Sequence, residues 1–323
     1  MIEHTSPSTT APDSGAAETR CGFVALVGAP NAGKSTLLNQ LVGAKVSIVT
    51  PKVQTTRARI TGIALEGASQ IIYVDTPGIF EPKRRLDRAM VTAAWSGISD
   101  SDAAVLLIDA GRAAHAAEGV DPDTRRILDG FKAKGKRPKH GALVLAINKI
   151  DLLERSRLLE LARVFDAEGI FDRIFMISAL TGDGVADLRG FLATNLPTGP
   201  WLYPEDQLSD IPQRLLAAEI TREKAFLMLH QELPYALTVE TEAWQERKDG
   251  SVRIDQVIIV GRENHKAMVL GHGGSRVKAI GSAARQELEA QLGRRVHLFI
   301  HIKVQPNWQD IPEHYRAIGL EFE

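Results

Sequence analysis

The chain has a single cysteine, Cys21, so no disulfide can form within it, and one free thiol fits a reducing cytoplasm. No stretch approaches the roughly 18–20 consecutive apolar residues that a membrane-spanning helix requires, which predicts a soluble protein. Peripheral attachment to the inner face of the cell membrane stays open as an alternative. The formal net charge is only −1, which hides any local basic surface, so charge has to be examined segment by segment.

The first 20 residues lack the apolar core of a secretion signal. They are rich in Ser, Thr, Ala and Pro, a composition that buries too little apolar surface to fold, so we expect a disordered tail over residues 1–20. The whole chain has 323 residues, of which 44% are hydrophobic and 24% charged, as is usual for a globular protein. This length favours two domains over one.

Residues 21–198 alternate short apolar runs with amphipathic helical stretches. The apolar runs predict strands buried on both faces, which begin at Phe23, Ile71, Ala103, Ala142 and Ile174. Helical periodicity begins between them near Lys34, Leu86, Pro122, Arg155 and Val185. This alternation predicts an α/β domain that has a mostly parallel sheet with helices on both faces.

A stretch rich in proline and glycine follows, and we expect a linker over residues 199–210. Beyond it the order of elements changes. A segment with helical periodicity comes first, followed by two strand-like runs that are separated by the turn Lys248-Asp249-Gly250. Two predicted helices on either side of a glycine-rich break come next, and an apolar strand comes last. The predicted order is therefore α-β-β-α-α-β. Since no internal repeat is visible, we expect residues 211–323 to form a different, α+β domain.

The first predicted strand runs into GAPNAGKS, residues 28–35, which matches the phosphate-binding loop pattern. The backbone N–H groups of such a loop surround a phosphate at close range, which glycine permits, and the following helix points its positive end at the anion. Lys34 then neutralises charge on the β- and γ-phosphates, and the Ser35 hydroxyl binds Mg²⁺. The strand before this loop and the helix after it argue against a chance glycine-rich turn.

The run Asn148-Lys149-Ile150-Asp151, at the end of a later strand, distinguishes guanine from adenine. The Asp151 carboxylate accepts hydrogen bonds, and guanine offers two adjacent donors, whereas adenine lacks the 2-amino group and presents an acceptor at N1. Charge-assisted hydrogen bonds are worth roughly 1.5–3 kcal/mol each, so losing two predicts discrimination of at least about 100-fold. Asn148 would brace the loop, and Lys149 would lie along the base.

Two further segments supply candidates for sensing the γ-phosphate. The run Asp75-Thr76-Pro77-Gly78 ends a strand, where Asp75 can hold Mg²⁺ through water and the Gly78 N–H can detect the γ-phosphate. A threonine hydroxyl in the weakly periodic run QTTR, residues 54–57, can complete the Mg²⁺ shell only when the triphosphate is bound. We favour Thr56 over Thr55 for this role.

These candidates define the expected site. We assign Mg²⁺ to Ser35, Thr56 and Asp75, and the catalytic roles to Lys34, Thr56 and Gly78. The candidate GTP-binding residues are Gly28, Ala29, Pro30, Asn31, Ala32, Gly33, Lys34, Ser35, Thr36, Asp75, Thr76, Pro77, Gly78, Asn148, Lys149, Asp151, Ser178 and Ala179.

The ordered motifs GxPNxGKSTLLN, QTTR, DTPG, NKxD and SAL resemble those of the translation-factor-related bacterial GTPases, and the C-terminal domain narrows the resemblance to the Era family. The resemblance extends from about Cys21 to the end of the chain. It implies a P-loop GTPase domain followed by a type II KH domain, with GTP, GDP and Mg²⁺ as ligands.

Many GTPases place a glutamine after the DxxG motif to orient the attacking water. Here Ile79 and Phe80 follow Gly78, so we expect slow intrinsic hydrolysis, with charge stabilisation by Lys34, Mg²⁺ and backbone amides. The resemblance also implies that Asn31 helps to coordinate K⁺. The alternative, that Asn31 only shapes the loop, stays open.

The C-terminal domain carries a GxxG loop, residues 271–274, between two predicted helices. In a KH domain this loop lets the backbone approach four nucleotides, while an adjacent apolar groove takes the bases. From Ser251 to Val304 the chain has nine cations and four anions, a net charge of +5 that predicts salt-sensitive binding of phosphate backbones. The candidate RNA-binding residues are Lys266, Gly271, His272, Gly273, Gly274, Arg276 and Lys278.

The resemblance implies a partner as well: the single-stranded 3′ region of 16S rRNA. The chain would then act as a cytoplasmic monomer that assists assembly of the small (30S) ribosomal subunit. The alternative is a constitutive RNA-binding scaffold in which the guanine nucleotide is structural. The Thr55/Thr56 segment and the DTPG loop favour a switch that responds to GTP binding and hydrolysis over this scaffold, because a structural nucleotide site needs no γ-phosphate sensors.

Overall fold

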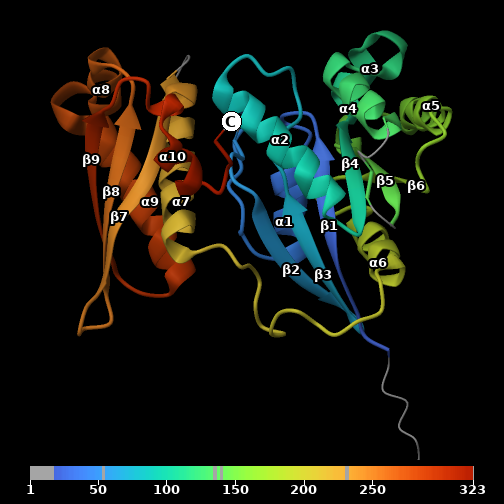
Figure 1. The fold of residues 1–323 in the computed structure, drawn as a ribbon, viewed down its shortest axis with the longest axis horizontal. Coiled ribbons are helices and arrows are strands. Elements are labelled where there is room, and N and C mark those ends of the chain that lie inside the picture. The colour runs from blue at the N-terminus through green and yellow to red at the C-terminus, as the bar shows by residue number, and fades with distance from the viewer. Residues whose placement is uncertain (1–17, 53–54, 134–136, 139–140, 230–232, 323) are drawn as a thin grey trace, which may run out of the picture.

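The computed structural model describes residues 18–52, 55–133, 137–138, 141–229 and 233–322; most of the expected tail, residues 1–17, lies outside this range. The chain forms an N-terminal body, from β1 to α6, beside a C-terminal body, from α7 to β9 (Figure 1). In the described part of the chain, no helix is both long and apolar enough to cross a membrane.

The N-terminal body is built on a six-stranded sheet in the order β2-β3-β1-β4-β5-β6. All neighbouring strands run parallel except β2 and β3. The strands are β1 (Arg20–Gly28), β2 (Ile60–Glu66), β3 (Ser69–Asp75), β4 (Ala103–Asp109), β5 (Leu143–Asn148) and β6 (Arg173–Ile177). The mostly parallel sheet is as predicted, but the sequence analysis missed the antiparallel edge strand β2.

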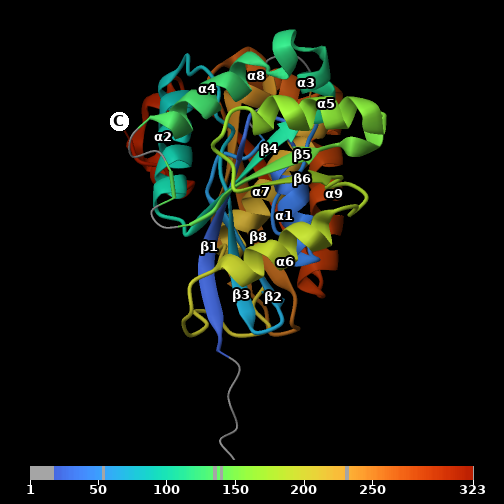
Figure 2. The same ribbon diagram turned by 90° about the vertical axis from the view of Figure 1, so that its right-hand side faces the viewer.

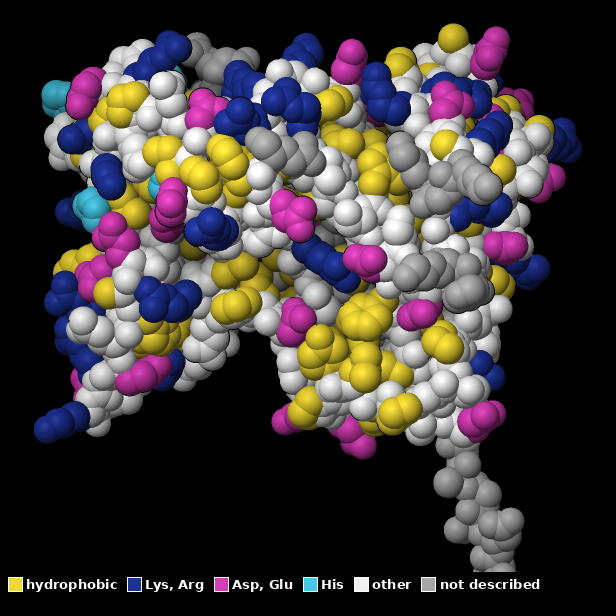
Figure 3. Space-filling model, in the orientation of Figure 1, with side chains coloured by type: hydrophobic (Ala, Val, Ile, Leu, Met, Phe, Trp, Pro, Cys, Tyr) yellow, Lys and Arg dark blue, Asp and Glu magenta, His cyan; other side chains and the backbone are white. Residues whose placement is uncertain are grey.

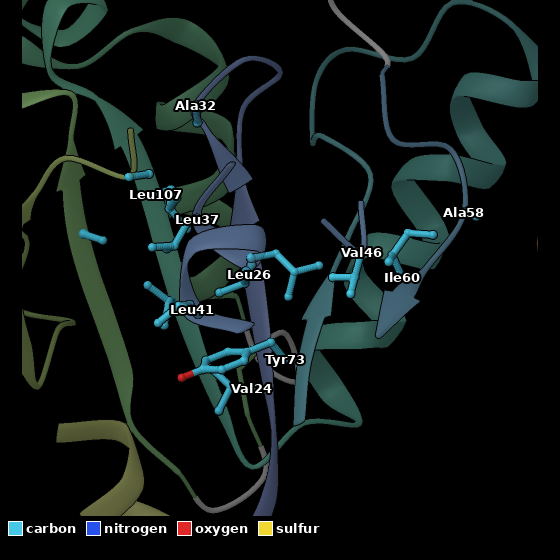
Figure 4. Close-up of a cluster of buried hydrophobic side chains, with 14 of the residues drawn as sticks. Val24, Leu26, Ala32, Leu37, Leu41, Val46, Ala58, Ile60, Tyr73 and Leu107 are labelled. Atoms are coloured by element: carbon cyan, nitrogen blue, oxygen red, sulfur yellow. The ribbon is translucent and has the colours of Figure 1, made fainter. Parts of the chain in front are cut away.

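Helices cover both faces of this sheet (Figure 2). They are α1 (Lys34–Val42), α2 (Arg85–Ser99), α3 (Ala110–His115), α4 (Pro122–Lys132), α5 (Arg155–Asp166) and α6 (Val185–Asn195). On one face, Leu37 and Leu41 of α1 lie against Val24 and Leu26 of β1, all of them buried (Figure 4). The central strands are apolar on both faces because both are covered, which explains their continuous apolar runs.

The C-terminal body follows the predicted order α-β-β-α-α-β. Its sheet has the order β7-β8-β9, with β7 antiparallel and β9 parallel to β8. The elements are α7 (Gln213–Met228), β7 (Leu237–Glu246), β8 (Val252–Val260), α8 (Glu263–Leu270), α9 (Ser275–Leu292) and β9 (Val296–Val304). This order of elements and these strand directions are those expected from the resemblance to a type II KH domain.

The connection between the two bodies lies along the edge of the first sheet. Gln70 of β3 accepts hydrogen bonds from the backbone N–H groups of Leu202 and Tyr203, at 2.9 and 3.0 Å. Further along, Ile63 N donates to Leu208 O at 2.9 Å, and Ser209 Oγ donates to Thr61 O at 2.5 Å. Most of the predicted linker, residues 199–210, is thus attached to the sheet.

The segment after β9 joins the two bodies. It contains α10 (Pro312–Ala317), which the sequence analysis did not predict. Trp308, Tyr315 and Ile318 of this segment are buried in the same apolar cluster as residues of β2 and α2. Since Val257 and Ile259 of β8 belong to this cluster too, the C-terminal segment connects the second sheet to the first body.

Candidate nucleotide site and its contacts with the C-terminal body

The predicted phosphate loop joins β1 to α1 and lines a cleft of about 530 Å³, a volume typical of small-molecule sites. Gly33 has φ +99°, and a Cβ atom there would lie 2.2 Å from Asn148 Nδ2, so only glycine fits. Gly33 is also the N-cap of α1, and no side chain caps this helix. The N–H groups of its first turn are therefore available to an anion.

Lys34 is 6% exposed and directed back into the loop, where its Nζ donates to the carbonyls of Gly28 and Ala29 at 3.1 Å each. Burial lowers the pKa of Lys34 to about 8, although the neighbouring Asp75 favours its charged form. A phosphate held in the loop would pair with the ammonium group and raise this pKa.

The three residues predicted to hold Mg²⁺ lie together. Asp75 is fully buried, and its Oδ2 accepts hydrogen bonds from Ser35 Oγ, Ser47 Oγ and Thr56 Oγ1 at 2.6, 3.0 and 3.2 Å. Burial raises the pKa of Asp75, and the charge of Lys34 and these hydroxyls oppose the rise. The Asp75 Oδ1 is buried without a hydrogen-bond partner among the described residues. A carboxylate beside hydroxyl oxygens fits a hard cation such as Mg²⁺.

The two neighbouring threonines point to different places. Thr56 Oγ1 lies 2.8 Å from Ser35 Oγ, within the oxygen cluster. Thr55 Oγ1 instead donates to the backbone carbonyl of Lys52 at 2.7 Å and lies 2.6 Å from Thr50 Oγ1. The geometry agrees with the preference for Thr56. Ser47, by contrast, joins the cluster without any motif that could have identified it.

The Gly78 turn contacts the phosphate loop directly. Gly78 lines the cleft, and the N–H of Ile79 donates to Gly28 O at 3.1 Å. The side chain of Ile79 is fully buried, so it does not reach toward a bound nucleotide. Thr76 is turned away as well, because its hydroxyl donates to Leu26 O at 2.8 Å.

Asn148 connects the predicted base-binding segments to the phosphate loop. Its Nδ2 donates to Ala32 O at 2.8 Å, and its Oδ1 accepts from the N–H of Ala179 at 2.9 Å. Ser178 is buried, and its hydroxyl accepts from the N–H of Thr181 at 3.3 Å. Asn148 therefore braces this region, as the sequence predicted.

Lys149 and Asp151, which follow Asn148, are more exposed to solvent than Asn148. Lys149 has φ +66° and lines the cleft, and its Nζ lies 2.6 Å from Asp109 Oδ2. Asp151 is exposed, and within the described part of the chain its carboxylate has no hydrogen-bond or ion-pair partner. Its oxygens are therefore available to a ligand, although Asp151 is not among the residues that line the cleft.

Arg112 of α3 also lines the cleft, and the sequence analysis missed it. Its Nη1 donates to Pro30 O of the phosphate loop at 3.3 Å, and its Nη2 lies 2.8 Å from Asp121 Oδ1. Asp109 caps the same helix by accepting from the N–H of Arg112 at 3.1 Å. Asp109 thus contacts both α3 and Lys149.

The loop between α1 and β2, of which residues 43–52 and 55–59 are described, connects this site to the C-terminal body. We call it the α1–β2 loop. Glu223 of α7 accepts from the N–H of Val49 at 2.9 Å and pairs with Lys45 at 2.7 Å. Arg222, the preceding residue, donates to Thr55 O and is itself paired with Glu219.

Arg57 makes a further contact from this loop. Its guanidinium is 1% exposed, and Nη1 donates to Leu237 O, at the start of β7, at 2.7 Å. The rings of Phe226 and Trp308 lie 5.7 and 5.9 Å from its central carbon. Burial lowers the pKa of Arg57 to about 9, and the charge of Arg222 adds to the effect.

The GxxG loop, residues 271–274, connects α8 to α9 in the C-terminal body. Gly271, Gly273 and Gly274 have φ values of +69°, +57° and +76°, which favour glycine. His272, Arg276 and Lys278 are exposed around this loop, and Lys266 is partly buried. Arg276 Nη1 donates to the carbonyl of Met268. The structure therefore gathers the predicted RNA-binding residues at one loop.

A phosphate loop with an NKxD brace, joined to a domain with a GxxG loop, defines a P-loop GTPase with a C-terminal KH domain. The family model described as "50S ribosome-binding GTPase" matches residues 23–149, and the one described as "KH domain" matches residues 232–309. The chain belongs to the Era family of GTPases.

Curated relatives carry the name GTPase Era. The protein from Dinoroseobacter shibae is 59% identical over 307 residues, which cover 95% of this chain and 97% of the relative. The protein from Rhizobium meliloti is 58% identical over 308 residues, with 95% of each chain covered.

Solved structures agree with this assignment. Era in complex with MgGDPNP and nucleotides 1506–1542 of 16S ribosomal RNA is similar at a TM-score of 0.85 and 39% identity. A variant of Aquifex aeolicus Era bound to GDP and AlF4− matches with the same values. In both cases the similarity covers 93% of this chain and 99% of the solved one.

Proposed function

We propose that this GTPase is a nucleotide-controlled switch that binds the 3′ region of 16S rRNA through its KH domain and assists assembly of the small ribosomal subunit. Support for the RNA comes from the similar Era structure with nucleotides 1506–1542 of 16S ribosomal RNA. Further support is the GxxG loop, whose exposed cations suit a phosphate backbone.

The observation that best supports a nucleotide-controlled switch is that the α1–β2 loop contributes to the expected Mg²⁺ site and also contacts the KH domain. Thr56 belongs to the oxygen cluster with Ser35 and Asp75. Its neighbours Thr55 and Arg57 are hydrogen-bonded to the KH domain. If Mg²⁺ and the triphosphate move Thr56, the hydrogen bonds that its two neighbours make with the KH domain are therefore altered as well. This coupling favours the switch over a scaffold with a structural nucleotide.

In the proposed site, the phosphate loop and Lys34 hold the triphosphate, and Asp151 accepts the two guanine donors. Ser35, Thr56 and Asp75 would hold Mg²⁺, which neutralises phosphate charge when bound. The backbone N–H of Gly78, which lines the cleft, would detect the γ-phosphate. Since Ile79 is buried and cannot orient water, we expect the intrinsic hydrolysis to be slow.

Asn31 is the candidate for a second cation. Its Nδ2 donates to Pro51 O of the α1–β2 loop at 3.0 Å, so its amide lies between the phosphate loop and that loop. A K⁺ ion coordinated by the amide oxygen would add positive charge there. This charge could replace the arginine that other GTPases supply to the transition state.

We propose that the protein acts in the cytoplasm, as a monomer, on the 30S subunit. Neither the fold nor the comparisons supports peripheral attachment to a membrane.

The test is the affinity for RNA in the two nucleotide states. Fluorescence anisotropy with a labelled RNA equivalent to nucleotides 1506–1542 would be measured with GDP and with a non-hydrolysable GTP analogue. We expect tighter binding with the analogue. Lys34→Ala, which removes the phosphate-neutralising charge but leaves the KH domain folded, should abolish the difference. Equal affinities in both states of the unmodified protein would favour the scaffold.

A further inference from the structure

A second cavity, of about 450 Å³, lies between the two domains and away from the nucleotide site. Arg84 contributes to it from the start of α2, and Arg262 and His265 contribute from the start of α8. Figure 3 shows Lys and Arg side chains gathered along the upper margin of both domains, the side on which Figure 1 places the start of α2 and α8.

The basic groups of this cavity are not neutralised by the protein. In the described part of the chain, neither Arg84 nor Arg262 forms an ion pair, and both are exposed. Asp310 is the acidic residue among those that line the cavity, and Arg85 pairs with it at 3.6 Å. The surroundings therefore favour an anion.

Two further features provide hydrogen-bond donors. No side chain caps the N-terminus of α8, so the backbone N–H groups of Glu263 and Asn264 are available, whereas that of His265 donates to Asn264 Oδ1 at 3.0 Å. In addition, the Nδ1 atom of His265 is buried without a hydrogen-bond partner among the described residues, and it can donate in the tautomer or charged form that carries a proton there. Cations and free N–H groups together match the oxygens of a phosphate.

The cavity is connected to both functional parts of the molecule. Helix α8 begins at the cavity and ends at Gly271 of the GxxG loop, and its eight residues span about 12 Å. In the other direction, Arg84 is six residues beyond Gly78 in the chain, on the segment that leads from the nucleotide cleft into α2.

We propose that the cavity holds a backbone phosphate of a single-stranded RNA that continues beyond the four nucleotides held at the GxxG loop. Arg84 then gives the GTPase domain its own contact with RNA, on the segment that follows Gly78. This inference rests on the proposed RNA binding by the KH domain and adds a second RNA-binding element in the other domain.

The test compares short and long single-stranded RNAs cut from the 16S 3′ region, about 4 and 12 nucleotides long, the short one filling only the KH loop. With the GTP analogue bound, Arg84→Gln should weaken binding of the long RNA about three- to tenfold. It should also lower the slope of log affinity against log salt by about 0.7, the value for one phosphate contact on a single strand. Arg262→Gln should behave in the same way.

The matched control is Arg163→Gln on α5, since Arg163 is exposed and has no partner in the described part of the chain. No loss with Arg84→Gln beyond that of Arg163→Gln, or an equal loss with the short RNA, overturns the proposal. A separate variant tests the KH domain itself. Gly273→Asp adds a negative charge where a Cβ meets nothing within 4 Å, and although φ +57° strains most side chains, Asp tolerates this conformation better than most, so circular dichroism checks that the domain is folded. If this variant binds both RNAs normally, the proposed KH function fails instead.

Discussion

The guanidinium of Arg57 in the GTPase domain donates a hydrogen bond to the backbone carbonyl of Leu237 in the KH domain, 2.7 Å away. Arg57 follows Thr56, which belongs to the oxygen cluster around Asp75. Two consecutive residues, Thr56 and Arg57, therefore contact the expected Mg²⁺ site and the KH domain respectively.

Replacing Arg57 with alanine should uncouple the domains. The change removes a buried hydrogen bond and leaves a cavity between Phe226 and Trp308, which we expect to lower the free energy of unfolding by about 2–4 kcal/mol. The ratio of RNA affinities with the GTP analogue and with GDP should fall toward one. Urea denaturation and anisotropy measure the two effects.

The control for this prediction is Arg59→Ala, because Arg59 is exposed and lies two residues further along the same loop. It should leave both the stability and the affinity ratio unchanged. A ratio that is the same in Arg57→Ala as in the unmodified protein would contradict the coupling.

Nucleotide affinity should depend on pH through Lys34. Burial lowers its pKa to about 8 without nucleotide, so above pH 8 the protein must take up a proton to bind phosphate with a charged lysine. Affinity for GDP should then fall by up to about tenfold per pH unit above 8. Calorimetric titrations between about pH 7 and pH 9 in buffers of different ionisation enthalpy would detect the proton uptake.

The lowered pKa of Lys34 should also make the stability of the nucleotide-free protein depend on pH, but stability should rise with pH where nucleotide affinity falls. The ordinary pKa of lysine is 10.5, so between about pH 8 and 10.5 the unfolded chain binds more protons at Lys34 than the folded, nucleotide-free protein. The contribution of this group to the free energy of unfolding therefore rises with pH in that window. Lys34→Met should remove both trends, and their persistence in that variant would assign them to another group.

Asp151→Asn should change the base preference. The asparagine amide can donate to the 2-oxo group of xanthine but no longer offers a carboxylate to both guanine donors. We expect the affinity for GDP to fall at least about 100-fold and the affinity for XDP to rise. Competition binding with both nucleotides gives the ratio. A preserved preference for guanine would show that the base lies elsewhere.

Replacing K⁺ with Na⁺ should slow GTP hydrolysis if Asn31 holds a potassium ion. We expect about a tenfold or larger loss of turnover in the unmodified protein, since a fixed positive charge at the transition state is worth at least this much. Asn31→Ala should be equally slow with both ions. Phosphate release at constant ionic strength measures the rates, and identical rates of the unmodified protein in K⁺ and Na⁺ would leave Asn31 as a loop-shaping residue only.

The sequence predicted the strands that are buried on both faces, because such strands read as continuous apolar runs. It did not reveal β2, an edge strand of seven residues that contains Thr61 and Gly62 and follows a loop without periodicity. It missed α10 for a related reason, since six residues are too few to show a helical period. Short elements gain their stability from tertiary packing, which local patterns do not record.

In the nucleotide site, too, local sequence patterns could be predicted and long-range contacts could not. The phosphate loop and the NKxD run are local motifs, so their residues could be named in advance. The contact of Arg222 with the carbonyl of Thr55 joins residues 167 positions apart, and neither belongs to a motif that specifies it. Ser47 and Arg112 likewise reach the cleft only through the fold. Polar contacts between domains have no periodic signal in a sequence.

The attachment of the linker to β2 limits how the two domains can rearrange. The last contacts on the sheet edge are those of Leu208 and Ser209, and α7 begins at Gln213, so only residues 210–212 are left between them. Three extended residues span about 10 Å at most. While these contacts persist, the KH domain can rotate about one fixed point on the GTPase domain but cannot drift away from it, so RNA that it carries stays within a short radius of the nucleotide site.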